Sequence, residues 1–249
     1  MESFEERIEK LNRMISESRS TVFFGGAGVS TESGIPDFRS KDGLYNRHDV
    51  QFDAYSPEYL LSHECLYYES KVFFEYYRQK MNVDGILPNP AHLKLAELER
   101  AGKLDAVITQ NIDGLHGKAG SRRVFEIHGT TEECFCDRCG KQFPGSRIFN
   151  SDEPVPHCDC GGMIRPRVTL YGEGLPEEAW DGAIAALYRA ELFIVGGTSL
   201  MVYPANTMLH YFRGSKLVVI NREATSYDSE ADLVFRENIG EVLSRIEIR

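Results

Sequence analysis

Residues 21–30 read TVFFGGAGVS, a short apolar run that ends in a loop containing three glycines. Before this run, Phe4, Ile8, Leu11 and Ile15 recur at the spacing of an amphipathic helix. The order of the opening segment is therefore helix, strand and glycine loop, and glycine marks the point at which the chain turns sharply. This order predicts the beginning of an α/β fold.

Apolar runs and helical patterns alternate along most of the remaining chain. Further strands are expected at 104–109, 124–128, 168–170, 192–195 and 217–220. The main helices are expected at 56–80, 89–102 and 176–190. Because such alternation is typical of a parallel sheet covered on both faces, we expect an α/β fold of that kind.

The composition is that of an ordinary globular protein, with 249 residues, 42% of them hydrophobic, and a net charge of −10. This acidic balance argues against nucleic acid as the main partner, because such binding depends on clustered Lys and Arg. The N-terminal sequence MESFEERIEK is charged where a signal peptide would be apolar, and the apolar stretch 192–205 is too short to span a bilayer. We expect a cytoplasmic protein without a membrane partner, and a monomer.

Five of the six cysteines fall between residues 134 and 160, which indicates a metal site and not a disulfide scaffold. Cys136 and Cys139 are separated by two residues, and Cys158 and Cys160 follow after 18 more. This spacing is close to a zinc ribbon, although the second pair is one residue short.

Four thiolates would close the coordination sphere, so the predicted Zn²⁺ is structural and not catalytic. The glycines at 161 and 162 could supply the backbone freedom that the short second pair needs. A thioredoxin-like redox pair at Cys136 and Cys139 is the alternative, but it leaves the second pair unexplained. Cys134 and His157 are spare candidate ligands.

Glycine or short polar residues follow four of the expected strands. They are GGAGVS at 25–30, QNID at 110–113, GGTS at 196–199 and NRE at 221–223. Ligands of open α/β sheets bind at these strand ends, and small residues let backbone N–H groups approach phosphates. A nucleotide site is therefore predicted. The alternative is a tight turn with no ligand, because Gly26 and Gly28 fit the dinucleotide pattern but Thr31 stands at its third glycine.

Several of these segments together resemble the sirtuins, NAD-dependent protein lysine deacylases. The matching motifs are GAGVSTESGIPDFRS at 26–40, TQNIDGLH at 109–116, HG at 128–129, GGTSLMVYPA at 196–205, the four cysteines and Asn221. The resemblance covers nearly the whole chain, and the chain is similar to the compact bacterial form of the family. It implies a Rossmann-like domain of residues 1–44, 88–133 and 163–249. It also implies a smaller domain made of a helical insertion at 45–87 and the zinc-ribbon module at 134–162.

In this family NAD and an acyl-lysine peptide enter a cleft between the two domains from opposite sides. Carried over by position, the resemblance implies that NAD contacts Gly26, Ala27, Gly28, Thr31, Asp37, Phe38, Arg39, Gln110, Asn111, Ile112, Asp113, His128, Gly197, Thr198, Ser199, Asn221, Arg222 and Gly240. His128, Asn111 and Asp113 would be catalytic. The expected activity is deacetylation of acetyl-lysine in proteins, with release of nicotinamide and O-acetyl-ADP-ribose.

His128 would be the general base in this reaction, because a neutral imidazole has a pKa near the operating pH. Asn111 and Asp113 would orient the nicotinamide amide and a water, and Phe38 and Ile112 would keep water out. Two other functions are the alternatives to deacetylation. They are a hydride-transferring NAD dehydrogenase, for which no acidic residue follows at the expected distance, and a zinc-ribbon binding module with an inactive α/β domain.

Some positions depart from the common family pattern. Arg167 replaces an acidic or amide residue, Thr169 replaces an apolar residue of the lysine tunnel, and Gly240 replaces a polar residue near the adenine. Sirtuins that favour succinyl-lysine carry a Tyr-x-x-Arg pair, and the corresponding residues here are Phe74 and Tyr77. Neither would neutralise a buried carboxylate, so we expect acetyl-lysine to be preferred.

Overall fold

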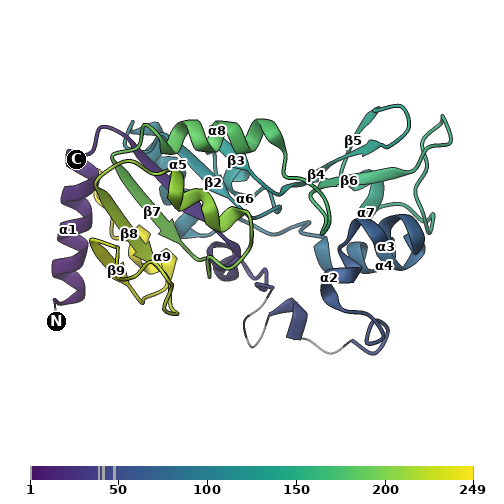
Figure 1. Ribbon diagram of the computed structural model, residues 1–249, viewed down its shortest axis with the longest axis horizontal. Helices are drawn as coiled ribbons and strands as arrows, with labels where there is room; N and C mark the ends of the chain where they lie inside the picture. Colours follow the sequence, from purple (N-terminus) through teal and green to yellow (C-terminus); the bar gives the residue numbers. More distant parts are fainter. Residues whose placement is uncertain (1, 39, 41–42, 47–48, 249) are drawn as a thin grey trace.

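The computed structural model of the chain describes residues 2–38, 40, 43–46 and 49–248 (Figure 1). Six strands form one parallel sheet in the order β3-β2-β1-β7-β8-β9. The strands are β1 (Thr21–Gly25), β2 (Ala106–Thr109), β3 (Val124–Glu126), β7 (Leu192–Gly196), β8 (Lys216–Ile220) and β9 (Leu233–Phe235). Because β1 lies between β2 and β7, the chain changes direction across the sheet there, and ligands of such sheets bind at this point.

Helices cover both faces of the parallel sheet, as predicted. Alternate residues of β1 point to opposite faces, with Phe23 in one apolar cluster and Phe24 in the other. The helices on the Phe23 side are α1 (Phe4–Glu17), α5 (Pro90–Arg100) and α9 (Ile239–Ser244). On the other side lie α8 (Glu177–Leu187) and the 3₁₀ segment η4 (Ala205–Tyr211).

Local sequence explains where the first long helices begin. The Ser3 hydroxyl accepts the N–H of Glu6, and the Glu6 carboxylate accepts the N–H of Ser3, which is a capping box at the start of α1. Asn89 caps α5 with its side chain, and Pro90 occupies the first helical position. The predicted helix at 89–102 is thereby confirmed within two residues.

A second, antiparallel sheet lies at the end of the molecule opposite α1, together with four helices (Figure 1). Its order is β5-β4-β6, from β4 (Gly129–Cys136), β5 (Gln142–Pro144) and β6 (Ile164–Val168). The accompanying helices are α2 (Pro57–Leu60), α3 (His63–Tyr68), α4 (Ser70–Met81) and α7 (Ser146–Phe149). A short helix, α6 (Leu115–Lys118), follows β2 in the larger part. The second sheet and its helices share an aromatic core that includes Phe73, Phe74 and Tyr77.

Two expected elements differ from the structure. The single helix predicted at 56–80 is three helices, because Ser62 caps α3 and Glu69 interrupts the chain before α4. The Glu69 carboxylate accepts hydrogen bonds from the hydroxyls of Tyr55 and Tyr59 at 2.6 and 2.7 Å, which fixes the break. The strand predicted at 168–170 instead spans Ile164–Val168, a segment in which Arg165 and Arg167 lie over the Phe135 ring.

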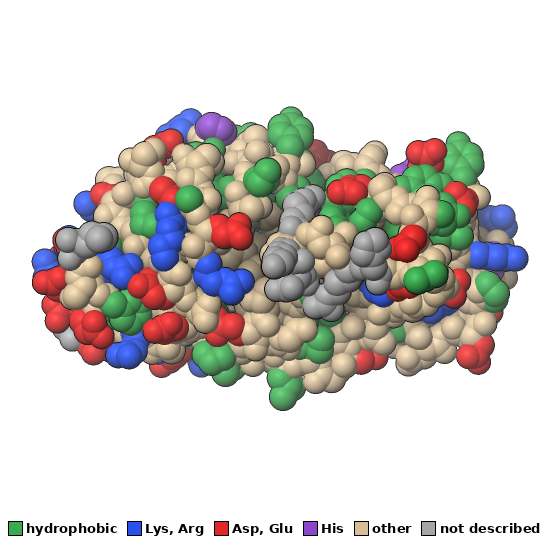
Figure 2. Space-filling view, turned by 90° about the horizontal axis from the view of Figure 1, so that it is seen from below, with side chains coloured by type: hydrophobic (Ala, Val, Ile, Leu, Met, Phe, Trp, Pro, Cys, Tyr) green, Lys and Arg blue, Asp and Glu red, His purple; other side chains and the backbone are tan. Residues whose placement is uncertain are grey.

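Charged side chains of both signs are mixed on one face of the larger part of the molecule (Figure 2). On the face seen in Figure 2, acidic and basic side chains are interspersed over the half that holds the parallel sheet. Among the described residues, the structure has no helix with the length and apolar character needed to cross a membrane.

Candidate functional site

A cavity of about 860 Å³ lies at the carboxyl ends of the parallel strands, beside the smaller sheet. Ala27, Gln110, Gly197 and Asn221 line it from the loops after β1, β2, β7 and β8. Val168, at the end of β6, lines it from the other side. The cavity volume falls within the range of about 300–1,000 Å³ that is usual for ligand sites.

Two glycine loops meet at the centre of this cavity. The Gly28 N–H donates to the Gly197 carbonyl at 2.8 Å, and a Cβ on Gly28 would lie 2.8 Å from the Gly197 Cα. Gly197 has a φ of +61°, which favours glycine. Backbone and the hydroxyls of Thr31, Thr198 and Ser199 therefore form much of the lining, a surface suited to the phosphates of a dinucleotide.

His128 follows β3 and lines the same cavity. Its Nδ1 lies 3.0 Å from the Gln110 carbonyl oxygen. Because a carbonyl only accepts, Nδ1 carries the hydrogen, and Nε2 is the basic nitrogen of the neutral ring. The His128 carbonyl in turn accepts the Thr169 N–H at 2.9 Å, which ties the histidine to the residue that follows β6.

A buried hydrogen-bond network supports the cavity wall behind Asn111. The Asn111 amide donates to the Ser30 hydroxyl at 2.9 Å, and that hydroxyl donates to Asp113 at 2.7 Å. Asp113 also accepts the Leu115 N–H. Asn111 lines the cavity, whereas Asp113 lies behind it and is 5% exposed. The predicted contact of Asp113 with NAD stays a prediction, while its hold on Ser30 is direct.

One buried histidine extends this network, and a second packs against it. The Asn89 N–H donates to His92 Nδ1, and His92 Nε2 lies 3.4 Å from the Ser30 hydroxyl. Burial lowers the pKa of His92 to about 4, although Asp113 opposes the shift. His116 packs against His92 with ring centroids 4.7 Å apart, and burial together with His92 lowers its pKa to about 3. Both rings are therefore neutral at physiological pH.

The opposite wall of the cavity is fixed by an ion pair. Arg165 donates to both oxygens of Glu173 at 2.7 and 2.8 Å, and His63 Nδ1 lies 2.9 Å from the same carboxylate. Burial alone would raise the pKa of Glu173, but these partners lower it to about 2. Thr169 lines the cavity, whereas Arg167 lies outside it and pairs with Glu133 at 2.8 Å. Arg167 therefore adds no unpaired charge to the lining.

Tyr77, from α4, lines the cavity beside Met81, and its ring stacks between Phe73 and Phe149. Phe74, one turn earlier, is fully buried and outside the lining. The guanidinium of Arg78 points elsewhere, because it donates to the carbonyls of Ile148 and Glu153. No Arg or Lys side chain of α4 faces the cavity in the described part of the chain.

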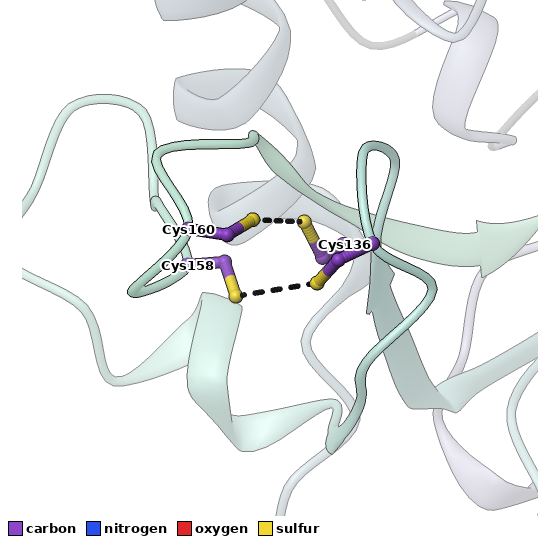
Figure 3. Close-up of side chains that lie close together, drawn as sticks. Cys136, Cys158 and Cys160 are labelled. Carbon is purple, nitrogen blue, oxygen red and sulfur yellow. Dashed lines mark hydrogen bonds between the residues drawn. The ribbon is translucent and has the colours of Figure 1, made fainter.

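The four predicted cysteine ligands come together at the end of the smaller sheet. Figure 3 shows Cys136, Cys158 and Cys160 pointing toward one another. The Sγ atoms of all four cysteines lie within 4.8 Å of one another, with Cys136–Cys160 at 3.4 Å and Cys139–Cys158 at 3.8 Å. A tetrahedral site with Zn–S bonds of about 2.3 Å has edges of about 3.8 Å between sulfurs. The cluster therefore fits zinc.

The glycines after the second cysteine pair have the role that the sequence suggests. Gly161 has a φ of +78°, and a Cβ on Gly162 would lie 2.6 Å from the Cys136 Sγ. Desolvation opposes ionisation of Cys136, but hydrogen bonds from the backbone of Cys139 and Arg138 lower the pKa of its thiol to about 7. Cys134 is not in the cluster, because its thiol donates to the Pro144 carbonyl.

The structure brings most of the predicted NAD contacts into one cavity. Those in its lining are Ala27, Gly28, Thr31, Asp37, Phe38, Gln110, Asn111, Ile112, His128, Gly197, Thr198, Ser199, Asn221 and Arg222. Gly26, Asp113 and Gly240 lie next to lining residues but not in the lining, and Arg39 lies outside the described residues. The prediction missed the lining residues Glu32 and Glu223, although Glu223 lies in the marked strand-end segment 221–223 and Glu32 lies in the motif at 26–40.

Comparison with known proteins agrees with this geometry. The profile of the Sir2 family matches residues 26–204. A relative from Cutibacterium acnes, named NAD-dependent protein deacetylase, is 53% identical over 240 residues, which cover 96% of this chain and 97% of that protein. One from Clostridium acetobutylicum with the same name is 49% identical, with coverages of 97% and 98%.

Solved structures are similar over nearly the whole chain. A Sir2 complex with a p53 peptide and NAD⁺ has a TM-score of 0.83 at 37% identity, and 96% of each chain is covered. A complex with a deacetylated p53 peptide and 3'-O-acetyl ADP ribose has a TM-score of 0.87 at 37% identity, with the same coverage. The fold and cavity define a parallel-sheet nucleotide-binding protein with a thiolate metal module. The chain belongs to the Sir2 family.

Proposed function

We propose that this protein removes acetyl groups from lysine side chains of proteins, with NAD as the co-substrate. Nicotinamide and O-acetyl-ADP-ribose are the products. One observation carries the proposal: His128, with its Nδ1 bonded to the Gln110 carbonyl, lines the same cavity as the two glycine loops. The relatives named NAD-dependent protein deacetylase support it.

NAD, when bound, supplies the ribose carbon that the acyl oxygen attacks as nicotinamide leaves. Nε2 of His128 then accepts a proton from a ribose hydroxyl, and the Gln110 carbonyl keeps the imidazole in the tautomer that this needs. Ser30 holds the Asn111 amide at the cavity wall, where it orients the nicotinamide or a water. Phe38 and Ile112 exclude bulk water.

The cofactor contacts proposed from the sequence bind different parts of NAD. The loops of Gly28 and Gly197 would hold the phosphates, and Asn221 would hold the adenosine ribose. The cysteine cluster would hold one structural Zn²⁺, which contributes to folding and takes no part in the reaction.

The acyl-lysine peptide would bind in extended form between residues 168–171 and 200–203, pairing with backbone. Exposed Met201 and Tyr203 and half-exposed Tyr171 line this entrance. The proposed domain division places residues 1–44, 88–133 and 163–249 in the NAD-binding domain. The insertion at 45–87 and the module at 134–162 form the smaller one, and their shared aromatic core supports that grouping.

A cytoplasmic location and a monomeric state are part of the proposal. A cluster of free thiols is stable in a reducing compartment, which supports the location. Sedimentation of the purified protein at a mass near 28.2 kDa is the expected result for the monomer.

Nicotinamide release from NAD tests the proposed function. Purified protein is incubated with NAD and a peptide carrying acetyl-lysine, and both nicotinamide and the deacetylated peptide are quantified by mass spectrometry. We expect equal amounts of the two products, and none with the unmodified peptide. Formation of NADH would identify a dehydrogenase, and binding of the peptide without turnover would identify a binding module. Either result overturns the proposal.

A further inference from the structure

Glu32 and Gly240 are in direct contact, although 208 positions separate them in the sequence. The Glu32 Oε1 accepts the Gly240 N–H at 2.9 Å. A Cβ added to Gly240 would lie 2.2 Å from the Glu32 Oε2. The carboxylate therefore occupies the space that any larger residue at position 240 would need.

This contact lies at one particular end of the cavity. In the order β3-β2-β1-β7-β8-β9, the loops after β3 and β2 carry His128 and Asn111, whereas Asn221 and Asn238 follow β8 and β9. Gly240 comes two residues after Asn238, in the first turn of α9. Because the proposed reaction takes place at His128, the nicotinamide end of NAD must lie at β2 and β3. The adenosine end then lies at β8 and β9, next to Glu32.

Two other acidic residues line this end, Glu223 and Glu237. Glu237 is paired with Arg7 at 2.6 Å. Asn221 and Glu223 follow β8, the position from which open sheets of this kind bind ribose hydroxyls. Among the described residues, Gly240 supplies the one hydrogen bond to Glu32 that the structure shows. Glu32 is exposed, and because an ionised carboxylate only accepts hydrogen bonds, its Oε2 is available to a donor from a ligand in the cavity.

Adenosine offers two kinds of donor. The ribose hydroxyls can donate and accept, and Asn221 and Glu223 would suit them. The exocyclic 6-amino group of adenine donates only, and it suits an acceptor-only partner. The geometry points to Glu32 as the residue that recognises the 6-amino group of adenine, with glycine at position 240 to leave room for the carboxylate. This inference rests on the proposed use of NAD.

Replacing the amino group by a carbonyl reverses the polarity of this contact. Nicotinamide hypoxanthine dinucleotide carries an oxygen at that position and would place an acceptor against Oε2. An unsatisfied pair of this kind reduces affinity by about tenfold or more. The dissociation constants of NAD and of this analogue, measured by isothermal titration calorimetry, therefore report on Glu32 without any turnover.

Two variants and a matched control complete the experiment. Glu32→Gln supplies an amide that can donate to the carbonyl of the hypoxanthine. We therefore expect the preference for NAD, which is the dissociation constant of the analogue divided by that of NAD, to fall to about a third of its wild-type value or less. Gly240→Ala displaces the Glu32 carboxylate, and it should reduce the preference for NAD over the hypoxanthine analogue in the same way. In the control, Glu99→Gln, the replaced carboxylate accepts the N–H groups of Arg122 and Arg123 far from the cavity. This variant should keep the full preference.

Equal affinities of the wild-type protein for the two dinucleotides would overturn the inference, as would an unchanged preference in Glu32→Gln. Thermal unfolding of each variant shows whether it is folded, and Glu32→Gln decides the matter if Gly240→Ala is not. Failure of the proposed function has a different signature, because the wild-type protein would then bind neither dinucleotide and release no nicotinamide with an acetyl-lysine peptide.

Discussion

The two sheets of this molecule are stabilised in different ways. Every residue of β1, β2 and β7 is buried, because helices cover both faces of the parallel sheet. In the smaller sheet β4 has exposed positions within it, and β5 has no fully buried residue. Apolar burial alone holds the first sheet, whereas the second ends in a cluster of four thiols that fits a metal ion. We therefore expect one wall of the cavity to depend on zinc and the other to be independent of it.

Metal removal should have the largest effect, and it should destabilise the smaller sheet without destabilising the parallel sheet. We expect one equivalent of zinc in the purified protein, and we expect Cys160→Ala or chelation to unfold the smaller sheet, because structural zinc contributes about 10 kcal/mol or more to such sites. Hydrogen exchange followed by mass spectrometry should show lost protection at residues 134–164 and retained protection in β1 and β7. Cys65→Ala removes a buried cysteine outside the cluster and should keep the zinc. A Cys160→Ala protein with full thermal stability and bound zinc would show that another residue is the fourth ligand.

Loss of His128 should affect chemistry without affecting either part of the fold. We expect His128→Ala to lower kcat by about 10²- to 10⁴-fold, because it removes the general base. NAD affinity and thermal stability should stay close to those of the wild type. His210→Ala, in a histidine outside the cavity, is the matched control and should retain activity. Turnover of His128→Ala above about a third of wild type at saturating substrate would be incompatible with the general-base role.

The acyl preference tests what the smaller part contributes to the cavity. Because Tyr77 lines the cavity and, in the described part of the chain, no Arg or Lys of α4 does, kcat/KM for succinyl-lysine should be about tenfold or more below that for acetyl-lysine on one peptide. Tyr77→Arg should raise the ratio of succinyl to acetyl activity. Arg78→Ala should leave it unchanged, since the Arg78 guanidinium binds backbone carbonyls outside the cavity. A wild-type kcat/KM for succinyl-lysine equal to that for acetyl-lysine would contradict the prediction.

Mild acid should destabilise the larger part through its buried histidines. The pKa values of His92 and His116 fall from an ordinary 6.5 to about 4 and about 3 on folding, so as the pH falls from 6.5 the unfolded chain takes up more protons at these sites, and the excess is nearly two near pH 5. Burial raises the pKa of Glu126 from 4.5 to about 7, so the folded chain binds one more proton there. The net excess of one proton in the unfolded state means that stability falls as pH falls, by about 1.4 kcal/mol per pH unit.

Urea unfolding at pH 6.5 and pH 5 measures this dependence. His157→Asn changes an exposed histidine near the cysteine cluster and should leave the slope unchanged. Equal free energies of unfolding at the two pH values would show that the buried imidazoles do not control stability in this range.

Features that depend on short sequence patterns could be predicted. The glycine loop after β1, the two cysteine pairs and the cap of α5 each involve residues close together in the chain, so their spacing determines their geometry. The parallel sheet was also predictable, because its strands are continuous apolar runs that only a sheet covered on both faces buries.

Features that depend on distant contacts could not be predicted. The break before α4 depends on the Glu69 carboxylate, which accepts hydrogen bonds from two tyrosine hydroxyls. The sequence pattern of this segment predicts one continuous helix. Asp113 follows a strand like Asn111, but Ser30 holds its side chain behind the cavity. Glu32 becomes part of the lining through its contact with Gly240, and no local pattern relates two positions so far apart.

The contact between Gly28 and Gly197 limits how this site can change during evolution. Most packed pairs can tolerate a larger residue on one side if a smaller one appears on the other. Here a Cβ on Gly28 would meet backbone atoms of Gly197, and glycine has no smaller replacement. No compensating substitution is available at this junction. The two loops must therefore be inherited as a unit.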